Sequence, residues 1–132
     1  MKNLMLLAAA VLALTLIAGC SSTKVVQGQD LKNENLSQSG TTVAHISSST
    51  LGLYGCVVFP MVTGSAEKPG TIAWFSEDSV QEGPVAEMVL SKAKDLGATR
   101  VEGLQSTKNI IIPIFPGLLN VYNVSASGNA VK

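Results

Sequence analysis

The sequence predicts an α+β fold, a two-layer sandwich in which one amphipathic helix packs on a mainly antiparallel sheet. One segment, 84–96, places its apolar residues on a single arc at helical spacing. Short β-branched and apolar runs, bounded by glycine and proline, come before and after it. A lone helix with one apolar side must bury that side against another layer, and a sheet is the layer that these runs supply.

The N-terminus has the order of features found in a secretion signal. Lys2 supplies a positive charge, and residues 4–18 form an uncharged apolar run that is short for a membrane span of about 20 residues. The run ends in Ile17-Ala18-Gly19-Cys20, which resembles the lipobox of bacterial lipoproteins. The resemblance implies cleavage between Gly19 and Cys20, a diacylglyceryl group on the Cys20 sulfur and usually an acyl chain on the new amine. A plain signal peptide or an uncleaved anchor are the alternatives.

The same resemblance sets the expected domains and location. Residues 1–19 are the signal that is removed, 20–40 are the lipidated cysteine with a flexible tether, and 41–132 are a single α+β domain. In enteric-type bacteria, a residue other than Asp after the lipidated cysteine directs the protein to the outer membrane. Ser21 occupies that position, which implies an outer-membrane anchor facing the periplasm. The inner membrane and the cell surface are the alternatives.

The charge of the mature chain argues against a nucleic-acid partner. Removal of Lys2 leaves eight basic and nine acidic side chains, a net charge of −1. No basic patch is visible, and nucleic-acid binding domains carry one. A chain of this length forms one domain with a modest core.

The segment after the lipobox has the composition of a tether. Residues 21–40 are rich in Ser, Gln, Asn and Gly, and their few apolar residues follow neither strand nor helix spacing. Twenty flexible residues span about 25 Å on average. Part of this tether could instead add an edge strand to the domain.

Three strands are expected before the helix. Residues 41–48 are β-branched and alternate weakly, and 71–75 form a second short run. Between them, 51–62 is an apolar run interrupted by glycines and ending near Pro60, which predicts a buried strand with a bulge. The turn is expected at 64–70.

The helix is the clearest element in the sequence. Pro84 suits the first helical position and Gly97 suits a left-handed terminator. Leu96 is expected to be buried under the turn that follows, and strands are expected at 98–107 and 121–126. The predicted buried arc consists of Val85, Ala86, Val89, Leu90, Ala93 and Leu96.

The apolar segment 110–119 has two interpretations. It can fold onto the domain, with Pro113 and Pro116 marking the ends of edge strands. Alternatively it is an exposed contact surface for a membrane or a partner. The residues of this possible contact surface are Ile110, Ile111, Ile112, Ile114, Phe115, Leu118 and Leu119.

The stretch 93–101, Ala-Lys-Asp-Leu-Gly-Ala-Thr-Arg-Val, resembles the helix–Gly-Ala–strand junction of small bacterial envelope lipoproteins such as the Rcs stress-sensor type. Domains once described as heavy-metal-binding have a similar junction. The resemblance transfers no function, because the cysteines that form the sensor's disulfides are missing. Only Cys56 remains once Cys20 is lipidated, and no Cys/His cluster supports a metal site.

Four other single residues or adjacent pairs are candidates for a site. Cys56 lies in an apolar run and is expected to be a buried, inert thiol. His45 is expected at a surface or half-buried strand position, without a catalytic or metal partner nearby. The adjacent acids Glu77-Asp78 are expected in a solvated loop. Of Trp74-Phe75, one ring is expected in the core and the other on the surface.

These observations predict a membrane-anchored envelope lipoprotein with a small non-catalytic domain that binds a partner or serves envelope maintenance or sensing. No catalytic residues, metal ligands or cofactor are predicted apart from the covalent lipid on Cys20. The expected partners are the membrane, through that lipid, and an envelope protein. A small cell-wall-directed enzyme or ligand-binding lipoprotein is the alternative. A polar cleft at His45 or at Glu77-Asp78 would favour the alternative, and a solid core with an exposed apolar edge would favour the non-catalytic protein.

Overall fold

The computed structural model describes residues 21–27, 37, 40–56, 59–66, 68, 71–75, 80–115 and 118–132, with the backbone alone at 114 and 115. The described chain contains one helix, α2, and six strands. Their bounds are β1 Ser21–Gln27, β2 Thr42–Gly55, β3 Phe59–Gly64, β4 Ile72–Trp74, α2 Glu82–Asp95, β5 Arg100–Phe115 and β6 Leu119–Val131.

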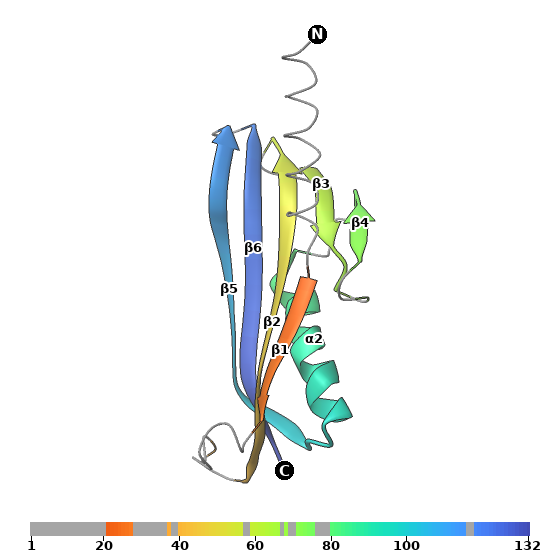
Figure 1. The fold of residues 1–132 in the computed structure, drawn as a ribbon. Coiled ribbons are helices and arrows are strands. Elements are labelled where there is room, and N and C mark those ends of the chain that lie inside the picture. Colours follow the sequence, from red (N-terminus) through yellow and green to blue (C-terminus); the bar gives the residue numbers. More distant parts are fainter. Residues whose placement is uncertain are drawn as a thin grey trace.

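The six strands form one antiparallel sheet in the order β4-β3-β2-β6-β5, with β1 as an additional partner of β2 (Figure 1). Strand β2 is the centre of the sheet and pairs along its whole length with β6. Its other edge is shared, since β1 pairs with residues 44–50 and β3 pairs with residues 52–55. The long strands β2, β5 and β6 therefore set the length of the molecule.

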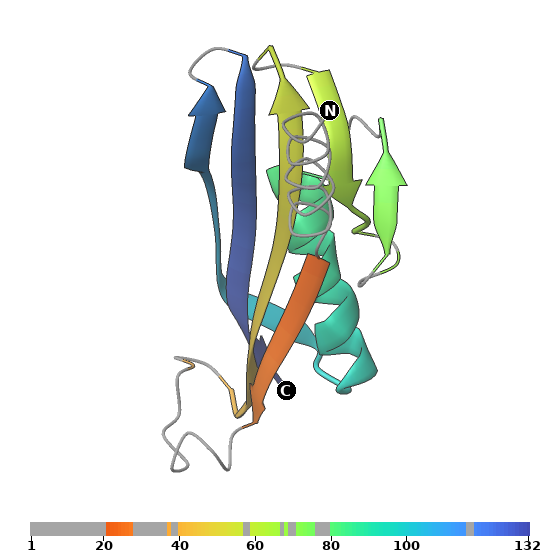
Figure 2. The ribbon, with the colours of Figure 1, turned by 45° about the horizontal axis from the view of Figure 1, so that its top comes forward.

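Helix α2 lies across one face of this sheet (Figures 1 and 2) and supplies the main core. In β2 the side chains alternate between buried and half-buried from Thr42 to Leu51, as strand geometry requires when one face is covered. Ile46 of β2 and Val124 of β6 are fully buried there, together with Val85 and Val89 of the helix. A second, smaller cluster on the other face consists of Leu53, Val62 and Val121.

The expected α+β sandwich is wrong, because the fold is dominated by strands. One 14-residue helix accompanies a six-stranded sheet in which β5 has 16 residues, β2 has 14 and β6 has 13. The sequence pattern ended the two C-terminal strands too early. Strand β5 continues through 108–115, and β6 begins at 119 and continues through 127–131, so the apolar segment between the expected strands is itself mostly strand.

Two other segments also join the sheet differently from the expected pattern. Residues Ser21–Gln27 lie within the expected tether and form β1. The alternative of an edge strand added by part of the tether is therefore the one observed. The run 51–62 is not one strand, because the chain turns at Cys56 and returns as β3. A register shift between Leu53 and Tyr54 provides the irregularity that the glycines indicated.

The helix is confirmed, but its buried face is rotated from the predicted arc. Val85, Val89 and Ala93 are buried as expected, whereas Leu90 is 38% exposed and Leu96 is only partly buried. Met88 takes the buried position instead. Its sulfur accepts a hydrogen bond from Thr50 Oγ1 at 3.9 Å, so the helix turns its Met88 side toward β2.

Gly97 ends the helix in the left-handed conformation, with φ at +72°, as the sequence predicted. We expect Gly97→Val to cost roughly 1–2 kcal/mol of stability, because an L side chain is strained at this φ. A Cβ here would meet only the Lys132 side chain, at 3.6 Å, so the cost comes from the backbone. Urea unfolding of residues 21–132 measures it. Gly97→Asn is the control, since asparagine tolerates this conformation, and an equal loss in both variants would contradict the explanation.

Candidate functional site

Exposed apolar side chains gather at one end of the sheet, where β2 turns into β3 and β5 turns into β6. Twelve large apolar side chains are exposed in the described chain, and only Val26, Leu90 and Leu104 lie away from this end. Phe75 is 74% exposed, Phe59 69% and Trp74 62%. We call the other nine the apolar end: Phe59, Met61, Ile72, Trp74, Phe75, Ile110, Ile111, Ile112 and Leu118.

Strand pairing aligns apolar residues in a row across this end. Ile112 of β5 pairs with Val121 of β6, and Val121 pairs with Leu53 of β2. Leu53 then pairs with Val62 of β3, which pairs with Trp74 of β4. Paired residues point to the same face of a sheet, so the row crosses five strands on the face opposite α2. Its middle members are buried, while Ile112 and Trp74 at its two ends are exposed.

The apolar end contains no charged residue. The sequence has no charge in 51–66, in 71–75 or in 109–123. The nearest cation along β5 is Lys108, whose Nζ lies 5.2 Å from the Tyr122 ring centre and 5.9 Å from that of Tyr54. The two tyrosine rings meet edge to face, with their centres 5.0 Å apart. Lys108 and this aromatic pair therefore mark the boundary of the uncharged region.

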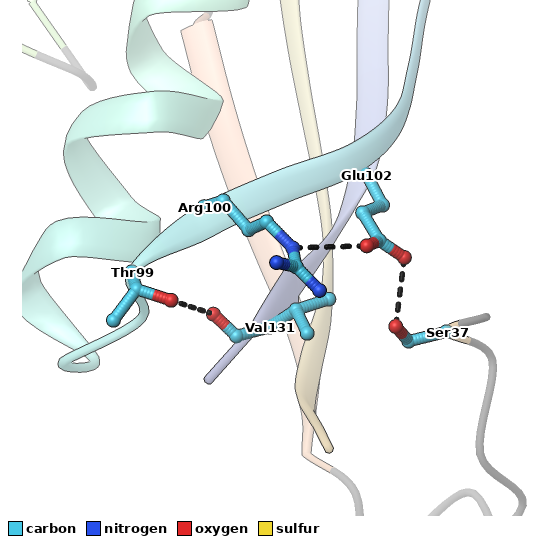
Figure 3. Close-up of polar contacts among 5 residues, drawn as sticks. All are labelled: Ser37, Thr99, Arg100, Glu102 and Val131. Atoms are coloured by element: carbon cyan, nitrogen blue, oxygen red, sulfur yellow. Dashed lines mark hydrogen bonds and ion pairs between the residues drawn. The ribbon is translucent and has the colours of Figure 1, made fainter. Parts of the chain in front are cut away.

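The opposite end of the sheet is polar. There Arg100 donates from Nε to Glu102 Oε1 at 2.9 Å, and Ser37 donates from Oγ to Glu102 Oε2 at 2.7 Å (Figure 3). Just before β5, Thr99 donates a hydrogen bond from Oγ1 to the Val131 carbonyl oxygen at 3.2 Å. The charged last turn of α2 lies near this end as well. The sheet thus has an apolar end and a charged end.

Most of the predicted contact segment belongs to the apolar end. Ile110, Ile111 and Ile112 are 54%, 51% and 47% exposed, and Leu118 is 65% exposed. Leu119 is half-buried and packs against the smaller core cluster. The side chains of Ile114 and Phe115 lie outside the described part. The segment forms strands, and these four side chains are exposed, while its contact with a membrane or a partner stays a prediction.

The expectation for the two aromatic neighbours was wrong, because both rings are exposed. Strand β4 has three residues and pairs only with β3, so Trp74 lies on an outer strand. Phe75 leaves the strand with φ at +55°, which breaks the alternation that would have turned its ring inward. Both rings therefore add to the apolar end. In the sequence, the exposure of both rings was indicated by the shortness of the apolar run 71–75.

The remaining candidates are dispersed. Cys56 was expected to be buried but is exposed, because it forms the turn between β2 and β3 with φ at +48°. Its N–H donates to the Leu118 carbonyl oxygen at 2.8 Å. His45 is half-buried on β2, as expected, with Nδ1 2.7 Å from Asn129 Oδ1. Glu77-Asp78 and Cys20 lie outside the described residues.

The described side chains contain no group of three or more His, Cys, Asp or Glu residues placed to hold a metal ion. A shallow hollow of about 270 Å³ beside α2 is lined by Ala66, Pro84, Glu87, Met88 and Ser91. None of the described helices is both long and apolar enough to cross a membrane. What the apolar end can do is bury hydrophobic surface against something else.

Comparison with protein-family models, with curated proteins and with solved structures gave no significant match.

Proposed function

We propose that this chain is the precursor of a bacterial lipoprotein whose mature form carries a small non-catalytic domain on the envelope membrane. The observation that carries the proposal is the sequence Ile17-Ala18-Gly19-Cys20 directly after an uncharged apolar run. Signal cleavage before Cys20 and a lipid on its sulfur make the domain an anchored protein. The residue after the cysteine, Ser21, favours the periplasmic face of the outer membrane.

Two features of the domain support a binding or structural role in the envelope. The exposed apolar end is the kind of surface that contacts a partner or a membrane. The three sequence segments that form this end, 51–66, 71–75 and 109–123, also carry no charged side chain, which suits contact with another apolar surface. The domain therefore serves envelope maintenance or sensing by contact.

The test is replacement of the proposed lipid site. Cys20→Ser is expected to abolish incorporation of labelled palmitate and to leave an uncleaved precursor or a soluble product. Cys56→Ser is the matched control, because Cys56 is the only other cysteine, and it should keep the label. Label that persists in Cys20→Ser would refute the proposal.

The location is tested separately on the unchanged protein. Membranes separated on a sucrose gradient are expected to carry it in the outer-membrane fraction. Ser21→Asp is a poor test of sorting here, since Ser21 is 6% exposed and donates from Oγ to the Ser65 carbonyl oxygen at 2.7 Å. That change would disturb the fold as well as the sorting signal. Co-migration of the unchanged protein with inner-membrane markers would overturn the assignment.

A further inference from the structure

The lipid attachment point lies directly at the sheet, with no spacer between them. Ser21 is the first residue of β1 and follows Cys20 in the chain. Consecutive Cα atoms are about 3.8 Å apart, so a lipid on Cys20 begins within one residue of the strand. Ser21 is fixed there by pairing with Thr50 and by its hydrogen bond to the Ser65 carbonyl oxygen. The domain cannot stand off the membrane on a flexible tether between the lipid and β1.

Ser21, the residue after the proposed attachment point, lies beside the half of β2 that leads to the apolar end. Strand β1 starts beside Thr50 and runs away from the apolar end, reaching Ala44 with Gln27. From Thr50 to Gly55, where β2 ends, the distance along the strand is about 17 Å at roughly 3.4 Å per residue. Toward the apolar end, the same edge of β2 is paired with β3 from Gly52 onward. The start of β1 therefore lies beside Thr50, which is five residues from the apolar tip of β2 at Gly55 and eight from its charged end at Thr42 (Figure 1).

The chemistry of the apolar end suits the interface of a lipid bilayer. Its exposed side chains include Trp74, Phe59 and Phe75, and tryptophan with other aromatic rings is favoured at the headgroup level. The three sequence segments that form this end, 51–66, 71–75 and 109–123, carry no charged side chain that would have to be desolvated. Lys108 at its boundary can keep its ammonium in water or at lipid phosphates while its stem lies along the tyrosine rings.

We infer that the apolar end lies in the interfacial region of the bilayer that holds the Cys20 lipid, so that the domain rests on the membrane by this end. The inference rests on the proposed function, because it requires the lipid on Cys20. In this orientation the lipid and the apolar end bind the membrane at two points. Binding of one raises the effective concentration of the other at the membrane surface. The charged end, with Arg100 and Glu102, points away from the lipid.

Trp74 is the only tryptophan in the chain, so its fluorescence reports on this end alone. The full, lipidated protein is reconstituted into vesicles of phosphatidylethanolamine and phosphatidylglycerol, with and without brominated acyl chains. The attachment of lipid to Cys20 is measured by mass in the same sample. We expect blue-shifted emission, quenching by the brominated chains and protection from acrylamide in the aqueous phase.

Paired variants locate the contact. Ile110→Glu combined with Ile112→Glu places charge in the apolar end and is expected to remove bromine quenching and restore acrylamide quenching. Leu104→Glu is the matched control, since Leu104 is also exposed on β5 but lies outside the apolar end. It should behave like the unchanged protein. All of these side chains are at least 41% exposed, so the fold is expected to tolerate the changes.

The outcomes separate the two proposals. If Cys20 carries its lipid and Trp74 of the unchanged protein is quenched by acrylamide but not by bromine, the inference is overturned and the proposed function stands. If Trp74 is protected from both quenchers, a second copy or a partner protein covers the apolar end, and the inference is again overturned. A Cys20 without lipid overturns both.

Discussion

Replacing Ile46 with alanine is expected to lower the free energy of unfolding by about 2–5 kcal/mol, the range of buried isoleucine truncations. Ile46 is 0% exposed and lies on β2, the strand at the centre of the sheet. It pairs with Gly128 on one side and Val25 on the other, and it belongs to the core cluster formed with α2. The cavity would lie under the helix, where neither the sheet nor α2 can collapse easily.

The matched control is Ile111→Ala, the same chemical change on the exposed part of β5. Ile111 is 51% exposed, so its truncation is expected to change stability by less than about 1 kcal/mol. Urea unfolding of residues 21–132, followed by circular dichroism, compares the two variants. If the two truncations cost the same, the helix does not cover the face of β2 that carries Ile46, and the assigned core is wrong.

The helix was predictable because its limits depend on local chemistry. Pro84 lies in its first turn and Gly97 follows its last residues at positive φ, and both act through their own backbone. The buried face was less predictable. Met88 and Leu90 are both apolar, and only the way the helix lies over Thr50 decides that Met88 is covered and Leu90 exposed.

The strands were harder to read because their lengths depend on pairing partners far away in the chain. Nothing local in Ser21–Gln27 indicates a strand, since it becomes one by pairing with β2 across at least 16 intervening residues. Similarly, β5 continues past Pro113, a residue that usually marks a strand end. It can do so because β5 is an edge strand, where a missing N–H need not break a ladder.

Only part of the apolar end was predictable from the sequence, and the reason is the same. The apolar character of 110–119 is visible in the sequence, and four of its large apolar side chains prove to be exposed: Ile110, Ile111, Ile112 and Leu118. The contribution of Phe59 and Trp74 was not visible. It requires the hairpin turn at Cys56, which places β3 and β4 beside the end of β2, and no periodicity within one segment reports that arrangement.

Gly52→Ala is expected to destabilise the domain by about 1–3 kcal/mol, because it overpacks a site that has no free volume. A Cβ at Gly52 would lie 2.5 Å from Val80 Cγ2 and 3.1 Å from Thr63 Cγ2. Val80 is 0% exposed and lies two residues before α2. The glycine in β2 therefore makes room for the segment that leads into the helix, and the added methyl group must push that segment away.

Two further variants test this cause against a general intolerance of alanine. Val80→Ala removes the group that clashes, so the double variant with Gly52→Ala should cost less than the sum of the single changes, by about 0.5–3 kcal/mol for residues in contact. Gly83→Ala is the matched control, since a Cβ there meets nothing within 4 Å. Because Gly83 lies in the first turn of the helix, the control should be neutral or stabilising by roughly 0.5–1 kcal/mol. Strict additivity in the double variant would show that Val80 does not set the cost at Gly52, and the packing between β2 and the start of α2 would have to be reassigned.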